Sequence, residues 1–313
     1  MTPAGQIDMV TRFLGALREA LDAGAELPDA MARSAAVLPL DTRDRVRTAL
    51  RRLSGDYDED EWGFDEEFVR MVEPAFEFLY DRWWRVRTEG VDNVPARGRA
   101  VLAANHAGIL PWDATMMSLA IRREHPAPRH PRFLVLDWAF ELPYVSVAIR
   151  KLGGVVASPH NATRMLEQDR LLAVFPEGVK GTGKPFKERY RLQRFGRGGF
   201  VEVALRTGAP IIPVAVVGSE EIYPKLGEAP LLARLLGAPF FPLTPTFPWL
   251  GPIGVVPLPS KWRIEFCDAI ETASYGPAAA DDRRLVLELS EQVRETIQGK
   301  LYENLVKRGR TLV

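Results

Sequence analysis

The sequence predicts an α/β fold: a mostly parallel sheet of about seven strands flanked by helices, with an N-terminal helical extension and a C-terminal helix. Beyond residue 84, short β-rich runs alternate with helical patterns, as they do in proteins with parallel sheets. Several runs are apolar at every position, as strands buried on both faces must be. The composition is 46% hydrophobic and 26% charged, which is typical of a globular protein and excludes collagen, coiled-coil and disordered classes.

Three regions are expected along the chain. Residues 1–67 form a helical extension that ends in an acidic linker, and residues 68–275 form the α/β domain. Residues 276–313 carry an amphipathic helix that we expect to dock on the domain. Its apolar residues recur at four-residue steps: Leu285, Leu289, Val293, Ile297, Leu301 and Leu305.

Strands are predicted at residues 84–87, 100–104, 133–136, 154–157, 171–175, 211–217 and 262–266. Polar, glycine-bearing loops follow three of them, and these loops begin at Asn105, Pro176 and Gly218. Ligands of open α/β sheets bind at the carboxyl ends of strands. The three loops are therefore expected to converge on one site.

Charge and cysteine content narrow the partners and the compartment. Lys plus Arg number 41, as do Asp plus Glu, so no global positive field exists to bind nucleic acid. The single Cys267 lies in a run typical of a buried strand, which favours a reducing cytosol and an unreactive thiol. The N-terminus lacks the features of a signal peptide. The uncharged run 238–259 contains seven prolines, so we expect no spanning helix there.

His106 and Asp113 are candidates for a general base and its orienting carboxylate. Pro111 favours the first turn of a helix, which leaves His106 in the preceding loop. On one straight helix, residues seven apart would be separated by about 10 Å. The pair can therefore form a hydrogen bond only if the loop folds back, and Gly108 can supply the turn.

A second block combines a glycine-rich turn with basic residues. Gly178, four residues, Gly183 and Lys184 approach the pattern of a phosphate-cradling P-loop, but Pro185 replaces the Ser or Thr that binds magnesium. This mismatch argues against a nucleotide hydrolase. Residues 180–197 hold seven basic residues and one acid, which favours a site for phosphates or lipid headgroups over a merely solvated face.

Together these blocks resemble the glycerolipid and lysophospholipid acyltransferases. Asn105-His106 with Asp113, the Phe-Pro-Glu-Gly block at 175–178, and the apolar, proline-bearing strand at 209–214 match that family in order. The basic, glycine-rich stretch at 194–199 is similar to a segment between the family's second and third blocks. The resemblance covers about residues 84–270.

The resemblance implies transfer of a fatty acyl group from a thioester donor, acyl-CoA or acyl-carrier protein, to a hydroxyl of a glycerolipid. The acceptor would be a lysophospholipid, a glycerol phosphate or a mono- or diacylglycerol, and no metal or redox cofactor is implied. His106 would be the general base, oriented by Asp113. The remaining candidates are substrate-binding residues: Asn105, Gly108 or an amide near Gly178 for the oxyanion, Glu177 for the acceptor pocket, and Lys180 and Lys184 for a phosphate.

Two departures from the family leave alternatives open. The family places four residues between the histidine and the aspartate, whereas this chain has six. That spacing motivates the alternative of a catalytically inactive lipid-binding or lipid-transfer protein. The segment 153–159 lacks the arginine that the family uses for an acceptor phosphate, so an acceptor without a phosphate also stays open. A serine hydrolase is disfavoured because no Gly-x-Ser-x-Gly occurs.

Two further expectations concern lipid. We expect a cytoplasmic protein, peripheral on the cytoplasmic face of a membrane, that inserts side chains of its proline-rich segment: Phe240, Phe241, Phe247, Trp249 and Leu250. A long acyl chain must also be hidden from water, so we expect a groove leading away from His106. We expect at least some of its lining to come from two candidate walls: Met116, Met117 and Leu119 on one side, and residues 133–144 with Trp138 and Phe140 on the other.

Overall fold

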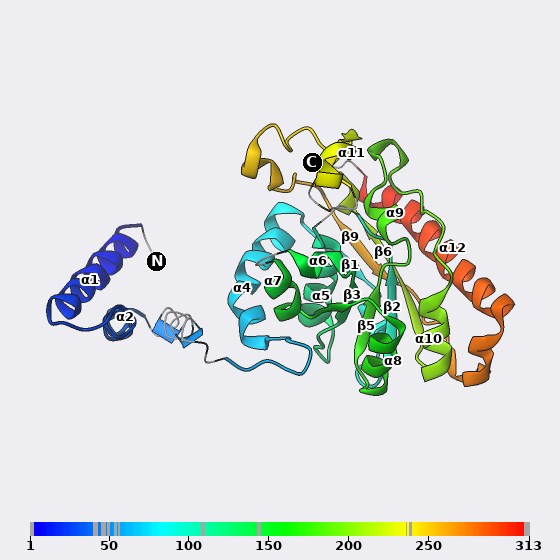
Figure 1. Ribbon diagram of the computed structural model, residues 1–313, viewed down its shortest axis with the longest axis horizontal. Helices are drawn as coiled ribbons and strands as arrows, with labels where there is room; N and C mark the ends of the chain where they lie inside the picture. Colours follow the sequence, from blue (N-terminus) through cyan, green and yellow to red (C-terminus); the bar gives the residue numbers. More distant parts are fainter. Residues whose placement is uncertain are drawn as a thin grey trace. The chain divides into compact units, whose positions relative to one another are not determined.

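The computed structural model describes residues 3–39, 43–44, 48, 51–52, 55, 57–107, 110–142, 145–235, 237 and 240–309 (Figure 1). The chain forms two compact units. One comprises Met1–Glu61 with Asp65–Met71, and the other comprises Trp62–Phe64 with Val72–Val313.

The first unit is helical. It contains α1 (Pro3–Asp22), α2 (Leu27–Ser34), a 3₁₀ turn at Ala35–Val37 and the beginning of α4 (Glu66–Phe78). Arg52 forms ion pairs with the buried Asp65 and with Glu67. These contacts connect the basic stretch of this unit to the acidic start of α4.

The second unit contains the mostly parallel seven-stranded sheet that the sequence predicts. The strand order is β1-β9-β6-β2-β5-β3-β4, and only the β6–β9 pair is antiparallel. The strands are β1 (Arg87–Glu89), β2 (Ala100–Ala104), β3 (Arg132–Val135), β4 (Gly154–Val156), β5 (Leu171–Val174), β6 (Ile211–Val217) and β9 (Arg263–Phe266). A second, two-stranded sheet pairs β7 (Gly227–Glu228) with β8 (Pro242–Leu243).

The strand predicted at residues 84–87 begins later in the structure, at Arg87, so the prediction is wrong for residues 84–86. Residues Leu79–Trp83 continue α4 as a π-helical turn, and Trp84 ends that turn. The ring of Trp84 is fully buried and stacks on Trp262 at a centroid distance of 4.7 Å. Burial of this large side chain keeps Trp84 in the turn, and β1 begins only at Arg87.

The second unit contains several helices, some of which cover the two faces of the large sheet. They are α5 (Trp112–Glu124), α6 (Trp138–Glu141), α7 (Val145–Lys151), α8 (Pro159–Glu167), α9 (Val179–Thr182), α10 (Gly199–Thr207), α11 (Pro230–Leu235) and α12 (Arg283–Arg308). Shorter 3₁₀ turns lie at Val91–Asn93, Phe186–Glu188, Ser219–Glu221, Gly251–Val255, Ala273–Tyr275 and Pro277–Asp281. Alternate residues of β2 pack in two separate cores, one with α8, α10 and α12 and the other with α5 (Figure 1).

The C-terminal helix α12 packs against β6 and β9. Four apolar residues of α12 are buried in the core that this helix shares with α10: Leu289, Val293, Ile297 and Leu301.

Cys267, just after β9, is 5% exposed, and burial raises the pKa of its thiol to about 12. In the part of the chain that is described, no helix combines the length and the apolar character that a membrane crossing requires.

Candidate active site

The three predicted loops lie together at the carboxyl ends of β5, β2 and β6, which are neighbours in the sheet. The backbone N–H of His106, after β2, donates to Oε1 of Glu177, after β5, at 3.3 Å. Lys184 connects Glu177 with Glu220, which follows β6, through contacts of 3.5 and 3.0 Å. The loops therefore form one site, as the sheet topology predicts.

His106 and Asp113 are in direct contact. Nδ1 of His106 lies 2.6 Å from Oδ2 of Asp113, which sits in the first turn of α5 and is 1% exposed. The same oxygen accepts from the backbone N–H of Ala107 at 3.0 Å, so the loop folds back onto the helix. The six-residue spacing is thus compatible with the pair. Gly108, the predicted turn residue, lies outside the described residues.

The contacts of the imidazole fix its orientation. An ionised carboxylate accepts hydrogen bonds, so Asp113 selects the tautomer in which Nδ1 carries the proton. Nε2 then holds the free lone pair. The ring also stacks on Phe175 at a centroid distance of 4.2 Å, and the His106 side chain is 17% exposed. The site therefore has a single histidine nitrogen that can accept a proton from a ligand.

The side-chain amide of Asn105, one of the candidate oxyanion donors, is bound to the backbone of β6. The side chain is fully buried. Its Nδ2 donates to the carbonyl of Val216 at 2.9 Å, and its Oδ1 accepts from the N–H of the same residue at 2.7 Å. The amide therefore joins the end of β2 to β6 and holds the loop that carries His106.

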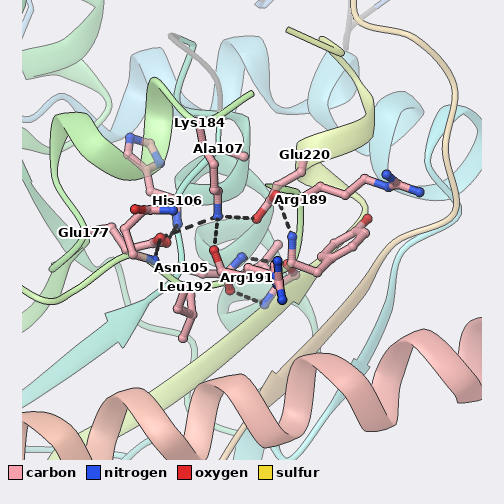
Figure 2. Close-up of polar contacts among 12 residues, drawn as sticks. Asn105, His106, Ala107, Glu177, Lys184, Arg189, Arg191, Leu192 and Glu220 are labelled. Carbon is pink, nitrogen blue, oxygen red and sulfur yellow. Dashed lines mark hydrogen bonds and ion pairs between the residues drawn. The ribbon is translucent and has the colours of Figure 1, made fainter. Parts of the chain in front are cut away.

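Lys184 also differs from its prediction as a phosphate contact. Its side chain is 3% exposed, between the carboxylates of Glu177 and Glu220 (Figure 2). The ammonium also donates to the carbonyl of Arg191 at 3.1 Å. All three of its donors are bound internally, because a buried ammonium must be paired.

The two carboxylates beside Lys184 are buried as well. Oε2 of Glu177 accepts from the N–H of Gln193 at 2.7 Å, and Oε2 of Glu220 accepts from the N–H of Tyr190 at 2.8 Å. With its side chain fully buried, Glu177 fixes the His106 loop and is not placed to bind acceptor hydroxyls. Burial raises the pKa of Glu220 to about 7, against the opposing effect of Lys184.

Gly178 and Lys180 mark the rim of the site. Gly178 has φ +56° and ψ −145° at the start of α9, a conformation that favours glycine. Its N–H donates to the carbonyl of Phe175 at 2.9 Å. Lys180 is exposed and is not among the residues that line either cavity described below.

Two neighbouring cavities share part of their lining, and His106 lines the larger of them. The larger, about 510 Å³, is lined by His106 itself and by apolar side chains of the β3–α7 region. The smaller, about 220 Å³, is lined by Ala107 and by polar groups that include Lys184, Ser219 and Glu220. Three residues line both: Leu110, Thr182 and Phe240. His106 therefore borders one cavity, and its neighbour in the chain, Ala107, borders the other.

The expected groove is thus present, but only one of its predicted walls is correct. Trp138 and neighbouring residues between 133 and 142 line the larger cavity, whereas Phe140 does not. Tyr144 lies outside the described residues. Three other predicted wall residues are wrong, because α5 packs them into the core beneath the sheet: Met116, Met117 and Leu119.

Sequence reasoning assigned no role to Tyr190 or Ser219. The hydroxyl of Tyr190 accepts from the N–H of Gly218 at 3.1 Å and donates to Glu221 at 2.7 Å. Ser219 lines the smaller cavity and is 2% exposed. The place of Ser219 in the sequence could have identified it as a site residue, because Gly218-Ser219 directly follows β6, a buried strand next to β2. Among the described residues, no cluster of three or more His, Cys, Asp or Glu could hold a metal ion.

The chain is similar to several known proteins. A family model described as Acyltransferase matches residues 85–217. An uncharacterized protein of Mycobacterium tuberculosis is 50% identical over 306 residues, which span 97% of this chain and 85% of that protein. A chicken (Gallus gallus) protein named "DGAT1/2-independent enzyme synthesizing storage lipids" is 25% identical over 167 residues, 53% of this chain and 49% of that protein.

Among solved structures, the 1-acyl-sn-glycerophosphate (LPA) acyltransferase PlsC of Thermotoga maritima matches with a TM-score of 0.48 and 18% identity. The match covers 95% of this chain and 96% of that chain. A likeness at this level carries no functional argument.

Proposed function

We propose that this chain, which matches the Acyltransferase family model over residues 85–217, moves a fatty acyl group from a thioester donor to a hydroxyl of a glycerolipid acceptor, with His106 as general base. The observation that carries the proposal is the 2.6 Å contact between Nδ1 of His106 and Asp113, in a histidine that lines the larger cavity and whose neighbour Ala107 lines the smaller one. A general base must be held in one tautomer within reach of both substrates.

In the proposed reaction, Nε2 of His106 takes the proton of the acceptor hydroxyl while the hydroxyl oxygen attacks the thioester carbonyl carbon. The tetrahedral intermediate then expels the thiolate as the carbon–sulfur bond breaks, and the imidazolium returns the proton to sulfur. Asp113 stabilises the imidazolium between the two transfers. Because Asn105 is bound to Val216, the described candidates for the oxyanion donor are the backbone amides next to Gly178.

The larger cavity is suited to the acyl chain of the donor. Apolar side chains from β3, α6 and α7 line it, including Leu136, Trp138 and Ile149. Each buried methylene contributes about 0.8 kcal/mol, so a long chain is the part of the substrate that gains most from such a space. The exposed Lys180 and Arg197 are the proposed contacts for phosphates of the donor, whether coenzyme A or a carrier protein carries the thioester.

We propose further that the protein binds peripherally to the cytoplasmic face of a membrane through exposed apolar residues of segment 226–256. This lipid-facing patch comprises Leu226, Leu231, Leu235, Trp249, Leu250 and Ile253, which are 55–80% exposed. The patch differs from the expected set. Phe240 is 8% exposed and lines both cavities, and Phe241 and Phe247 are half-buried with their rings 5.3 Å apart.

The alternative, an inactive lipid-binding or lipid-transfer protein with the same fold, rested on the six-residue spacing between His106 and Asp113. The hydrogen bond between these residues removes that motive. Turnover separates the two functions, because a transfer protein binds lipid without forming a new ester.

The decisive experiment measures ester formation by mass spectrometry with acyl-CoA and acyl-carrier-protein donors. We expect His106→Ala and Asp113→Asn each to lower turnover by about two to four orders of magnitude, the loss typical of a missing or misoriented general base. His160→Ala is the matched control, because His160 is exposed on α8. Wild-type turnover in a folded His106→Ala variant would refute the mechanism. The absence of any ester product from the wild type would favour the transfer protein.

A further inference from the structure

Ser219 is a buried polar group for which the reaction proposed above has no use. It is 2% exposed, it lines the smaller cavity, and its Oγ has no hydrogen-bond partner among the described residues. Burying a hydroxyl without a partner is unfavourable, and such groups in native proteins call for an explanation. A ligand hydroxyl in the cavity would supply the missing partner.

The loop that carries Ser219 is held rigidly. Gly218 has φ +110°, and a Cβ at this position would lie 2.5 Å from Trp262. The Tyr190 hydroxyl binds the N–H of Gly218. Glu221, the next residue but one after Ser219, is paired with the largely buried Arg308 at 2.7 Å. Ser219 is therefore held at the cavity wall before a ligand arrives, which lowers the cost of binding.

Glu220 adds a second group that can bind a hydroxyl. Its Oε1 accepts from Lys184 and its Oε2 from the N–H of Tyr190. Each carboxylate oxygen has two acceptor sites, so one site per oxygen remains after these contacts. Ser219 and Glu220 thus offer one donor and several acceptors on adjacent residues, which is the complement of a diol.

The charges around the smaller cavity do not favour a phosphate. Lys184 is paired with two carboxylates, and Lys225 is paired with Glu228 at 2.9 Å and with the carbonyl of Gly183. Arg189, the remaining cation among the described lining residues, is exposed and lies over the ring of Phe186. Water screens a cation in such a position. A phosphate inside the cavity would instead face the buried carboxylate of Glu220.

The remaining wall of the smaller cavity is apolar and continues to the surface. Phe240 and Phe247 line the cavity, and so does Val255, which is also 42% exposed. Val255 is close in sequence to Trp249, Leu250 and Ile253 of the lipid-facing patch. The cavity therefore combines a polar end beside Ser219 with an apolar path outward, which suits an amphiphile whose polar part is small.

From these observations we infer that the smaller cavity binds the free hydroxyls of an uncharged acylglycerol acceptor, with Ser219 and Glu220 as its hydrogen-bonding partners. This inference rests on the proposed acyltransferase function and specifies its acceptor. The acyl chain of the acceptor lies along Phe240, Phe247 and Val255, and one glycerol hydroxyl reaches toward His106 past Ala107, which lines the smaller cavity.

The first test compares two acceptors that differ only in the phosphate: 1-oleoylglycerol and 1-oleoylglycerol 3-phosphate. Both are supplied to the full-length wild-type protein in the same detergent micelles with the same acyl donors. We expect kcat/KM to be at least about tenfold higher for 1-oleoylglycerol, because the phosphate meets Glu220 without a buried partner. Equal or preferred use of the phosphate acceptor would overturn the inference and leave the proposed function standing. No transfer to either acceptor, or to other glycerolipids, would overturn the proposed function itself.

Variants of Ser219 and Glu220 then test the role of each residue in binding the acceptor. In Ser219→Ala, KM for 1-oleoylglycerol should rise about tenfold while kcat changes little, as expected for a lost hydrogen bond in the bound acceptor. The matched control is Ser290→Ala, a buried serine on α12 that lines neither cavity. An unchanged KM in a folded Ser219→Ala variant would remove Ser219 from the acceptor site.

Glu220→Gln keeps the shape of the side chain and removes its charge. We expect the ratio of kcat/KM between the two acceptors to shift severalfold toward the phosphate. A ratio measured within one protein does not respond to a general loss of stability, so a purely structural role for Glu220 would leave it unchanged. An unchanged ratio would therefore count against the inference.

Discussion

The two neighbouring cavities beside the His106 loop differ in the chemistry of their linings. The larger is walled mostly by apolar side chains of the β3–α7 region, and these offer a ligand burial but little hydrogen bonding. The smaller is bordered by the ends of β2 and β6 and by the ion cluster of Glu177, Lys184 and Glu220. An apolar cavity accepts acyl chains of different kinds, whereas buried polar groups disfavour any ligand that leaves them without a hydrogen-bond partner. Selectivity for the acceptor is therefore expected in the smaller cavity and selectivity for chain length in the larger.

Breaking the ion cluster should have the largest effect, and it should act on the smaller cavity. Lys184→Met leaves two buried carboxylates without their shared cation, which costs about 3–5 kcal/mol of unfolding free energy. Urea denaturation at neutral pH measures the loss. Burial raises the pKa of Glu220 to about 7, so below that pH the difference should shrink, because a protonated Glu220 no longer needs the cation.

Lys180→Met is the matched control, because Lys180 is an exposed lysine of the same segment and its removal should change stability by less than about 0.5 kcal/mol. Binding of a non-hydrolysable thioether analogue of the acyl donor should survive in Lys184→Met below its melting temperature, since the analogue occupies the larger cavity. If Lys184→Met were as stable as Lys180→Met, the cluster would not support the smaller cavity.

The lipid-facing patch adjoins the smaller cavity, so its removal should affect delivery of the acceptor. Trp249→Ser with Ile253→Ser removes two side chains that are 70% and 71% exposed. Each contributes about 1.5–3 kcal/mol when it inserts fully into an apolar phase. Flotation with phosphatidylcholine vesicles should show binding weakened by at least about tenfold. Binding by the wild type should persist at high salt, because the patch is uncharged.

The control for the patch is Tyr302→Ser with Val306→Ser, which removes exposed side chains of α12, 52% and 83% exposed. Unchanged flotation of the Trp249→Ser, Ile253→Ser protein would remove segment 226–256 from the membrane proposal. Turnover of an acceptor in detergent micelles should fall less than turnover in vesicles. Equal losses in both would point to damage in the cavity itself.

The larger cavity can be narrowed without touching the smaller one. Ala139, on α6, is half-buried and lines only the larger cavity. Ala139→Phe should shift the preferred donor to a shorter chain, with about fourfold lost for each methylene excluded. A series of saturated acyl-CoA donors measures the shift. Ala148→Phe, a half-buried alanine of α7 that lines neither cavity, is the control. An unaltered donor profile would place the acyl chain elsewhere.

The same contrast separates what could be predicted from the sequence from what could not. Both ends of the strand at 211–217 match the prediction, because the strand is apolar throughout and glycine-containing segments lie on either side of it. Convergence of the three loops followed from the rule that ligands bind at strand ends. The contact between His106 and Asp113 required only that the intervening loop fold back. Such features depend on local pattern and on topology.

The sequence does not indicate in the same way where individual side chains point. Met116 and Met117 are adjacent on a helix buried on several sides, so periodicity could not tell the core from a cavity wall. Lys184 lies in a basic stretch, yet its partner Glu220 is 36 residues away in the chain. Asn105 finds its partner, Val216, 111 residues away. Pairings at that distance are set by packing, and a single sequence does not record them.

The smallest predicted effect is a pH dependence confined to the smaller cavity. Burial raises the pKa of Glu220 to about 7, so its carboxyl is protonated at pH 5.5 and ionised at pH 8.5. Lys184 and Glu177 are the charged groups that face it. An ionised oxygen accepts a stronger hydrogen bond from an acceptor hydroxyl than a protonated carboxyl does. KM for 1-oleoylglycerol should therefore fall about threefold to tenfold as the pH rises through 7.

Glu220→Gln should lack this step, and comparing the two proteins at each pH removes the contribution of every other titrating group. KM for the donor should not show the step, because the donor lies in the larger cavity. A step retained in Glu220→Gln would assign the titration to another residue and leave the smaller cavity without a charge that senses the acceptor.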